Sequence, residues 1–199
     1  EFIKGRKVTG AFHGLTKSKT PGLLNTIFAR GNTAKEQIDS AFQQGLKNPE
    51  DIQFHFEIGS NYFLELAKLK AFRILWESKK RKSPFIFATT TLANKEEEFA
   101  YNNILRTTTE CMSAIFGGAN AIMVNSYNHS FEMPTEFSER IARNQQTILR
   151  KESYLDKVID PTKGAYYIDY LIDELLKDYE LIEIIEKENL ATTKWLSPE

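Results

Sequence analysis

The stretch from Tyr101 to Tyr127 constrains the fold most, because it encodes a helix, a stop and a strand in immediate succession. It opens with polar residues, continues as an apolar stripe at helical spacing, and reaches the pair Gly117 and Gly118. A short apolar run from Ala121 to Tyr127 follows directly. Gly117 is expected to be the left-handed residue that caps the helix. This order is the αβ half of a repeating unit in which strands alternate with helices.

Two further strands, each followed by a helix, precede this stretch. Residues 52–58 alternate strictly between apolar and polar side chains, which is the periodicity of a strand. Ser60 is the expected N-cap of the helix that follows, and Asn94 is expected near the start of the helix that ends at Phe116. The predicted elements are strands over 52–58, 84–91 and 121–127, and helices over 34–46, 61–78, 94–116, 134–151 and 166–187.

The chain divides into three regions. Residues 1–50 form a loop-rich lead-in with a short element near 22–29 and one helix, which starts at the capping box Thr33 to Glu36. Residues 51–190 hold the three strand–helix units, and residues 191–199 are expected to be a frayed tail. Such units predict right-handed crossovers in a parallel sheet, as in a slice of a (β/α)8 barrel or a doubly wound sheet. The pattern alone leaves both open, and a whole barrel needs roughly 250 residues.

The composition argues against several classes of function. Lysine and arginine total 26 against 27 aspartates and glutamates, so the chain lacks the excess positive charge that holds nucleic acid. No apolar run approaches the roughly 20 residues that span a bilayer, and the polar start at Glu1 is unlike a secretory signal. The single cysteine, Cys111, suits a reducing cytoplasm and is expected to be a small core residue, not a nucleophile. Because the chain begins with Glu1 and not Met, we expect a piece of a longer protein.

Few polar side chains in the sequence suggest chemistry. The histidines His13, His55 and His129 lie far apart and lack the spacing of a metal site. His55 and Glu57 project from one face of the same predicted strand, about 7 Å apart. If that face lines a barrel interior, the pair could bind a ligand or move protons. The alternative, which we favour, is that they hydrogen-bond each other and a neighbouring polar side chain.

Several motifs, in order from residue 52 to about residue 176, carry a resemblance to a known family. They are Gly59-Ser-Asn-Tyr-Phe-Leu-Glu-Leu-Ala-Lys-Leu-Lys-Ala-Phe-Arg73, Tyr101-Asn-Asn-Ile-Leu-Arg-Thr107, Phe116-Gly-Gly-Ala-Asn120, Pro134-Thr-Glu-Phe-Ser-Glu-Arg-Ile-Ala-Arg-Asn144, Asp160-Pro161 and Gly164-Ala-Tyr-Tyr167. With these motifs the chain resembles the substrate-binding barrel of the methylmalonyl-CoA mutase family. The resemblance implies the C-terminal half of a TIM (β/α)8 barrel, with the three strands as its sixth to eighth. It also implies adenosylcobalamin as cofactor and an acyl-CoA threaded along the barrel axis in the holoenzyme.

The departures from the family pattern fall on positions that contact ligands in the catalytic members. Those members carry Arg-Thr-His-x-Gln-Thr-Ser-Gly on the seventh strand, and the arginine, histidine and glutamine are replaced here by Phe85, Phe87 and Thr89. An arginine of the sixth strand is replaced by Asp51, and a glutamate on the cobalamin side falls at His129. The family's cobalt-ligating motif Asp-x-His-x-x-Gly does not occur in the chain.

Some members of this family pair a catalytic large subunit with a small subunit that keeps the barrel but lacks the chemistry. This chain resembles a segment of that small subunit, which implies a large subunit as partner, no catalytic residue here and no cobalamin held by this chain alone. The alternative is a divergent catalytic chain whose other half and cobalamin domain lie elsewhere. In that case Gln53, His55, Glu57 and Thr89 are the substrate-binding candidates, and His129 is the cofactor-binding candidate. Packing roles, not ligand contacts, are expected for Asn102, Asn103, Arg106, Arg140, Arg143 and Asn144.

Overall fold

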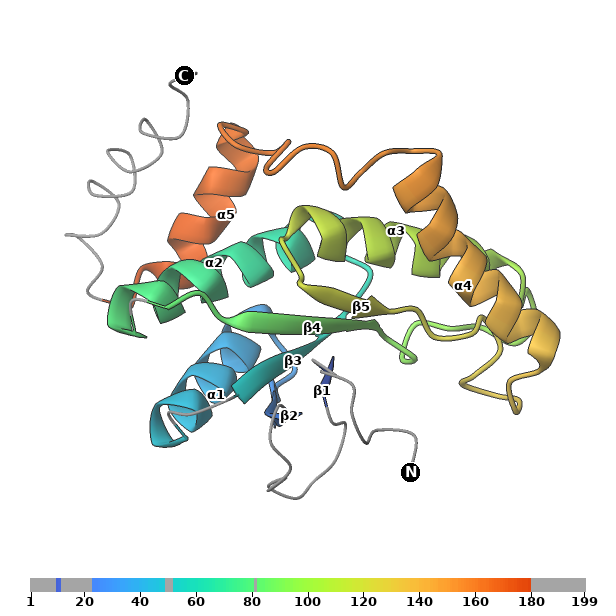
Figure 1. Ribbon diagram of the computed structural model, residues 1–199, viewed down its shortest axis with the longest axis horizontal. Coiled ribbons are helices and arrows are strands. Elements are labelled where there is room, and N and C mark those ends of the chain that lie inside the picture. Colours follow the sequence, from blue (N-terminus) through green and yellow to red (C-terminus); the bar gives the residue numbers. More distant parts are fainter. Residues whose placement is uncertain (1–9, 12–22, 49–51, 81, 180–199) are drawn as a thin grey trace, which may run out of the picture.

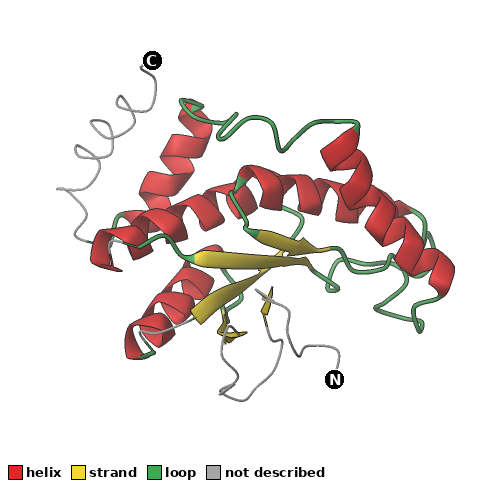
Figure 2. Cartoon of the chain, viewed as in Figure 1, coloured by secondary structure: helices red, strands yellow, loops and turns green. Residues whose placement is uncertain are grey.

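The computed structural model describes residues 10–11, 23–48, 52–80 and 82–179, which form a parallel sheet and its helices (Figures 1 and 2). Strands β2 to β5 are all parallel, their order in space follows their order in the chain, and β1 pairs with β2 at one edge. The predicted α/β class with alternating strands and helices is confirmed. The elements are β1 (Gly10–Ala11), β2 (Leu23–Phe28), α1 (Ala34–Lys47), β3 (Ile52–Ile58), α2 (Tyr62–Lys80), β4 (Phe85–Thr90), α3 (Asn102–Phe116), β5 (Ala121–Met123), α4 (Glu136–Lys151) and α5 (Tyr166–Leu176).

One face of the sheet carries the hydrophobic core. Even-numbered residues of β3 and β4 point to it, and Phe54, Phe56 and Ile86 among them are fully buried there. The ring of Phe54 lies 4.6 Å from Phe72 and 4.7 Å from Trp76 of α2. Buried residues of α1, α2 and α3 belong to the same cluster, so these three helices cover one face of the sheet. The odd-numbered residues of β3 and β4 therefore point to the opposite face.

Helix α2 is buried on nearly all sides. Leu66, Ala67 and Leu69 follow one another almost directly and are all fully buried, because α5 covers the side of α2 that faces away from the sheet. After α4 the chain crosses over α3 and returns to α2, as Figure 1 shows. Leu175 and Leu176 of α5 join the core cluster. The helices are thus layered two deep over β3.

Sequence periodicity located the elements well, but it placed some of their ends wrongly. The predicted strand over 52–58 and the capping box at Thr33 are confirmed, and the short element near 22–29 is strand β2. Strand β5 ends at Met123, four residues earlier than predicted. The reason is that Asn125 donates its backbone N–H to Thr90 Oγ1 (2.9 Å) and its side-chain amide to the Thr90 carbonyl (2.5 Å). These side-chain bonds replace further pairing in the ladder.

Helix α3 begins at Asn102, eight residues after the predicted start at Asn94. Residues between them form turns, because the side chains of Asn94 and Lys95 are drawn into a buried polar network described below. At the other end, Gly117 has a right-handed φ of −72°, and Gly118 is the left-handed residue with φ +80°. The predicted glycine stop is confirmed, but its left-handed residue is the second glycine.

The N-cap of α2 is Asn61 rather than Ser60. The Asn61 side chain accepts a hydrogen bond from the backbone N–H of Leu64 at 3.3 Å, as an N-cap residue does. Ser60 instead accepts a bond from the Asn94 amide at 2.8 Å. Both residue types are good N-caps, so the composition of the sequence does not separate them.

Some predictions fall outside the described residues. They concern most of the lead-in with His13, the position of Asp51 and the tail over 191–199. The helix predicted over 166–187 is wrong at its end: α5 stops at Leu176, because the chain turns there and Tyr179 donates its backbone N–H to the Leu176 carbonyl at 2.8 Å. Within the described part of the chain, no helix is both long and apolar enough to cross a lipid bilayer.

Candidate functional site

The candidate site lies on the face of the sheet opposite the core, which we call the inner face. It is built from the odd-numbered residues of β3 and β4, and the register of the ladder pairs Gln53 with Phe85, His55 with Phe87 and Glu57 with Thr89. Gln53, His55 and Thr89 are buried, whereas Glu57 is exposed. The sheet therefore brings all four predicted substrate-binding residues onto one surface.

His55 is held by Thr89. Its Nε2 lies 2.8 Å from Thr89 Oγ1, diagonally across the β3–β4 ladder. Two aromatic rings flank the imidazole: Phe28 of β2 meets it edge-on at 5.0 Å, and Phe87 lies tilted against it at 5.2 Å. The polar neighbour expected for His55 is therefore Thr89, the residue opposite Glu57. The predicted bond to a neighbouring polar side chain is supported by this geometry, whereas no hydrogen bond between His55 and Glu57 is found among the described residues.

Gln53 lies deeper in the inner face. Its amide Nε2 donates to Thr26 Oγ1 of β2 at 2.6 Å. Its carbonyl Oε1 is buried and accepts no hydrogen bond from the described residues. A buried amide oxygen without a donor costs free energy, so it would accept a bond from any donor that reaches it.

A cavity of about 550 Å³ opens where β2 and β3 end. His55 and Glu57 line it from β3, Arg30 from the segment after β2, and Gln37 from α1. The carboxyl ends of parallel strands are where α/β proteins commonly bind ligands. The cavity thus unites two of the predicted residues with a cation and an amide that the sequence did not single out. His129 is not among its lining residues; it is exposed on the connection after β5.

Lys68 of α2 holds two of the cavity-lining residues in place from the core side of the sheet. Its side chain is fully buried, and Nζ donates to the Gln37 side-chain oxygen (2.7 Å) and to the Glu57 backbone carbonyl (2.8 Å). It also forms an ion pair with Glu65. Burial lowers the pKa of Lys68, and the Glu65 carboxylate opposes that shift. The sequence signal for this role is a lysine between the apolar residues Ala67 and Leu69 of α2.

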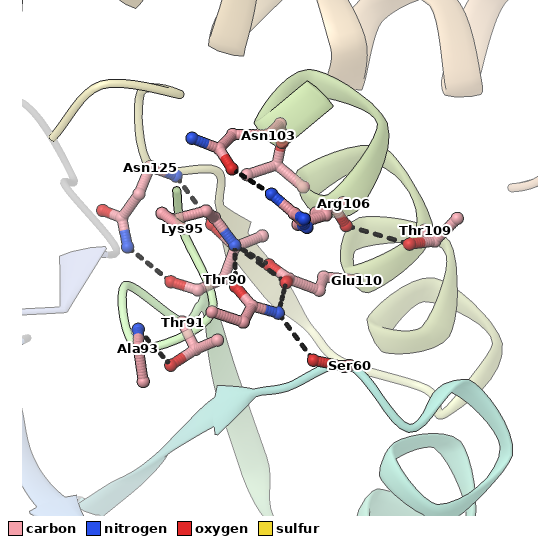
Figure 3. Close-up of polar contacts among 12 residues, drawn as sticks. Ser60, Thr90, Thr91, Ala93, Lys95, Asn103, Arg106, Thr109, Glu110 and Asn125 are labelled. Carbon is pink, nitrogen blue, oxygen red and sulfur yellow. Dashed lines mark hydrogen bonds and ion pairs between the residues drawn. The ribbon is translucent and has the colours of Figure 1, made fainter. Parts of the chain in front are cut away.

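A second buried polar cluster joins the loops after β3 and β4 to helix α3 (Figure 3). Lys95 Nζ lies 2.8 and 3.0 Å from the two carboxylate oxygens of Glu110, and neither side chain is more than 1% exposed. The Asn94 amide donates to Glu110 (2.7 Å) and to Ser60 Oγ (2.8 Å). Burial raises the pKa of Glu110 and lowers that of Lys95, and their mutual attraction opposes both shifts.

Asn103 of α3 joins the loop that follows β4 to the loop that follows β5. It accepts from the Glu96 backbone N–H (3.0 Å) and donates to the carbonyls of Glu96 (2.8 Å) and Tyr127 (2.9 Å). Arg106 donates to the Asn103 oxygen at 2.7 Å and pairs with Glu96 at 2.8 Å. The contacts support the packing roles expected for Asn103 and Arg106, whereas Asn102 is exposed.

The corresponding expectation for α4 is not matched by its contacts. Arg140 stacks over Phe137 at 5.5 Å and Arg143 pairs with Glu139 at 3.6 Å, both on the exposed side of the helix. Gln145 instead faces α3 and donates to the Ile104 carbonyl at 2.7 Å. An uncharged amide can be buried at a helix contact at lower cost than a guanidinium, so it takes this role.

These groups can hold a polar ligand, but the described residues offer little reactive chemistry. Cys111 is buried between α3 and α4, as expected of a small core residue, and burial raises its pKa to about 12. Among the described residues no group of three or more histidine, cysteine, aspartate or glutamate side chains has the geometry of a metal site. What the inner face presents is one imidazole fixed to a hydroxyl between two phenylalanine rings.

Comparison with known proteins gives one consistent result. The family model described as methylmalonyl-CoA mutase matches residues 32–190. Methylmalonyl-CoA mutase of Rhizobium meliloti (strain 1021) is 40% identical over 166 residues, covering 76% of this chain and 23% of that protein. Methylmalonyl-CoA mutase small subunit of Porphyromonas gingivalis (strain ATCC BAA-308 / W83) is 42% identical over 154 residues, covering 70% and 25%. The chain therefore spans about a quarter of the length of these relatives.

Proposed function

The chain belongs to the methylmalonyl-CoA mutase family, and on that premise we propose that it is part of a structural small subunit, inactive by itself. In the assembled enzyme a large catalytic subunit would bind the acyl-CoA and the cofactor and convert methylmalonyl-CoA to succinyl-CoA. The role of this chain is to contribute barrel structure and to stabilise its partner.

The observation that carries this proposal is that phenylalanine rings replace polar side chains on the inner face. Phe85 and Phe87 stand where the catalytic pattern of the family has arginine and histidine, and the Phe87 ring lies against His55. The hydroxyl of Thr89 is bonded to the same imidazole. A ligand group that needs charged or hydrogen-bonding partners at these positions would meet rings instead, at a cost of about 1–3 kcal/mol for each unpaired buried group.

The arrangement of the sheet supports a partial barrel. A doubly wound sheet reverses its strand order at a switch point, whereas β2 to β5 follow the chain without reversal. Helices α1, α2 and α3 cover a single face. We assign β3, β4 and β5 to the sixth, seventh and eighth strands of a (β/α)8 barrel, with the inner face toward its lumen.

The family uses adenosylcobalamin, and the described residues do not fit a corrin site. His55 is enclosed by Phe28 and Phe87 and bonded to Thr89. His129 is exposed, and the hydrogen bond found for it among the described residues runs from its backbone N–H to the Ser126 carbonyl at 3.1 Å. We therefore assign the cofactor to another part of the holoenzyme and derive no step through it here.

A divergent catalytic chain is the second candidate, and the cavity beside His55 and Glu57 favours it. The Gln53 side-chain oxygen, which accepts no bond from the described part of the chain, is also consistent with a ligand that donates to it. In this case Gln53, His55, Glu57 and Thr89 bind the substrate. His129 would then approach the cofactor side.

The deciding experiment is the adenosylcobalamin-dependent conversion of methylmalonyl-CoA by the full-length polypeptide that carries this segment. We expect no turnover by that polypeptide alone and turnover after the large subunit is added. The nearly isosteric substitution Thr89→Val should leave the activity of the mixture unchanged, because this hydroxyl serves His55 and not a substrate. If the polypeptide alone turns over methylmalonyl-CoA, and if the Thr89→Val variant does so more slowly, the structural role is overturned and the catalytic role is established.

A further inference from the structure

Helix α5 presents a fixed outward face. Its inner side is anchored by Ile168, Leu175 and Leu176, which are buried. The connection that leads into it is tied to α2 by Lys70, whose Nζ lies 2.6 Å from Asp160 and 2.5 Å from Thr162 Oγ1. Side chains on the opposite side of α5 are thus held in place, and no other described element covers them.

Four aromatic rings are exposed there, and we call them the tyrosine face. Tyr166 is 92% exposed, Tyr167 and Tyr170 are each 56% exposed, and Phe63 from the first turn of α2 is 49% exposed. Phe63 and Tyr167 meet edge-on with ring centroids 5.6 Å apart. Tyr166 and Tyr170 are neighbours on the helix at the i, i+4 spacing. Rigid aromatic side chains with a polar tip are enriched at protein interfaces, where they bury a large area at a small entropic cost.

The charges around the tyrosine face are mostly negative. Asp169, Asp173 and Glu174 are all exposed on the same side of α5. Lys177 is a cation on that side, and it is already paired with Glu174 at 2.8 Å. Two such faces would repel each other, so a second copy of this chain is a poor partner. Arginine and lysine are suitable, because they pair with the carboxylates and a guanidinium stacks on tyrosine rings.

The position of α5 also matters. It lies on α2, on the side of the helix layer away from the sheet and the inner face (Figure 1). Strands that extend the sheet would add at the β1 or the β5 edge, whereas α2 packs over the middle of the sheet. A protein bound to the tyrosine face would leave both edges and the cavity accessible.

We infer that the tyrosine face, with Asp169 and Asp173, is the surface on which the partner subunit docks through an arginine- or lysine-rich face of its own. This inference rests on the proposed function, because it takes the large mutase subunit as the partner. Beyond the proposed function, the inference specifies the surface of this chain that contacts the large subunit and the charged and aromatic groups that recognise it.

The test measures the affinity between the full-length polypeptide and the large subunit by titration calorimetry. We expect Tyr166→Ser combined with Tyr170→Ser to weaken binding by about tenfold or more, as truncation of central aromatic residues does. Asp169→Asn combined with Asp173→Asn should weaken binding and reduce its dependence on salt. Tyr154→Asn is the matched control: Tyr154 is 60% exposed, lies before α5, and has φ +53°, which asparagine tolerates.

The outcomes separate the two proposals. A complex that forms with unchanged affinity in both double variants overturns the docking surface and leaves the small-subunit role standing. Failure of the unsubstituted polypeptide to bind a large subunit overturns both. Because all four substituted side chains are exposed, circular dichroism should show unchanged helix content, so a loss of binding would report the contact and not unfolding.

Discussion

Replacing Glu110 by leucine should be the most destabilising single change in the loop network of Figure 3. The carboxylate is 1% exposed and accepts hydrogen bonds from Asn94 and Lys95. Leucine removes the counter-charge while Lys95 remains with 0% of its side chain exposed. Lys95 must then be buried as an unpaired ammonium or lose its proton.

The second route sets an upper limit on the cost. Deprotonating a lysine of ordinary pKa near 10.4 at pH 7 spans about 3.4 pH units at about 1.36 kcal/mol each, or about 4.6 kcal/mol. Measured losses for one partner of a buried ion pair are about 3–5 kcal/mol. We therefore expect Glu110→Leu to lower the free energy of unfolding by roughly 3–4.5 kcal/mol at pH 7.

Urea unfolding followed by tryptophan fluorescence is the assay, since Trp76 lies in the core. A double-mutant cycle with Lys95→Met should recover roughly 2–3 kcal/mol of the loss, because the pair is then replaced by two apolar groups. The penalty of Glu110→Leu alone should also shrink as the pH rises from 7 toward 10, because the unfolded lysine then holds its proton less firmly. A loss below about 1 kcal/mol that does not change with pH would show that water reaches the pair and would refute the argument.

Three further changes test other parts of the structure. Gly45→Ala should lower the free energy of unfolding by about 1–3 kcal/mol, because its Cβ would lie 2.5 Å from the Trp76 ring and 2.8 Å from Phe54; unchanged stability would mean that the rings yield. Above pH 9 the unfolded thiol of Cys111 ionises while the folded one, with a pKa of about 12, does not. Cys111 should therefore contribute a fall in stability of about 1.4 kcal/mol per pH unit there, and the slope measured in urea titrations should be less negative by that amount in Cys111→Ala. Asn103→Leu should lower stability by roughly 2–4 kcal/mol in the same assay, because it abolishes three bonds to two loops, and a neutral result would contradict that role.

Elements with a strong local signal were predictable from the sequence. The alternation over 52–58 and the reciprocal capping of Thr33 and Glu36 depend on neighbours in the chain, and the structure confirms both. The start of α3 depends on a distant residue instead. Asn94 looked like an N-cap, but its amide bonds Glu110 and Ser60, so the helix starts later. The local preference of a residue for a helix N-terminus is overridden where its side chain bonds to residues distant in the sequence.

The candidate site was predictable only in part, for a similar reason. Strand periodicity places His55 and Glu57 on one face, as the structure shows. Which residue of β4 meets His55 depends on the register between strands, and that register is set by the packing of the whole sheet. The pairing of His55 with Thr89 is therefore a property of the assembled sheet, and the sequence of either strand alone does not specify it.

The two faces of the sheet explain how a family scaffold can persist while a ligand site is lost. In a strand, neighbouring side chains point to opposite faces, so Phe85 and Phe87 can differ from the catalytic pattern without disturbing Ile86 and Ala88 beneath the helices. The loop network of Lys95 and Glu110 shares no side chain with the inner face. Packing and loop positions are therefore independent of the groups that would contact a ligand. A relative that is about 40% identical can share the scaffold and still differ in chemistry, so the inner face and not overall similarity decides whether this chain is catalytic.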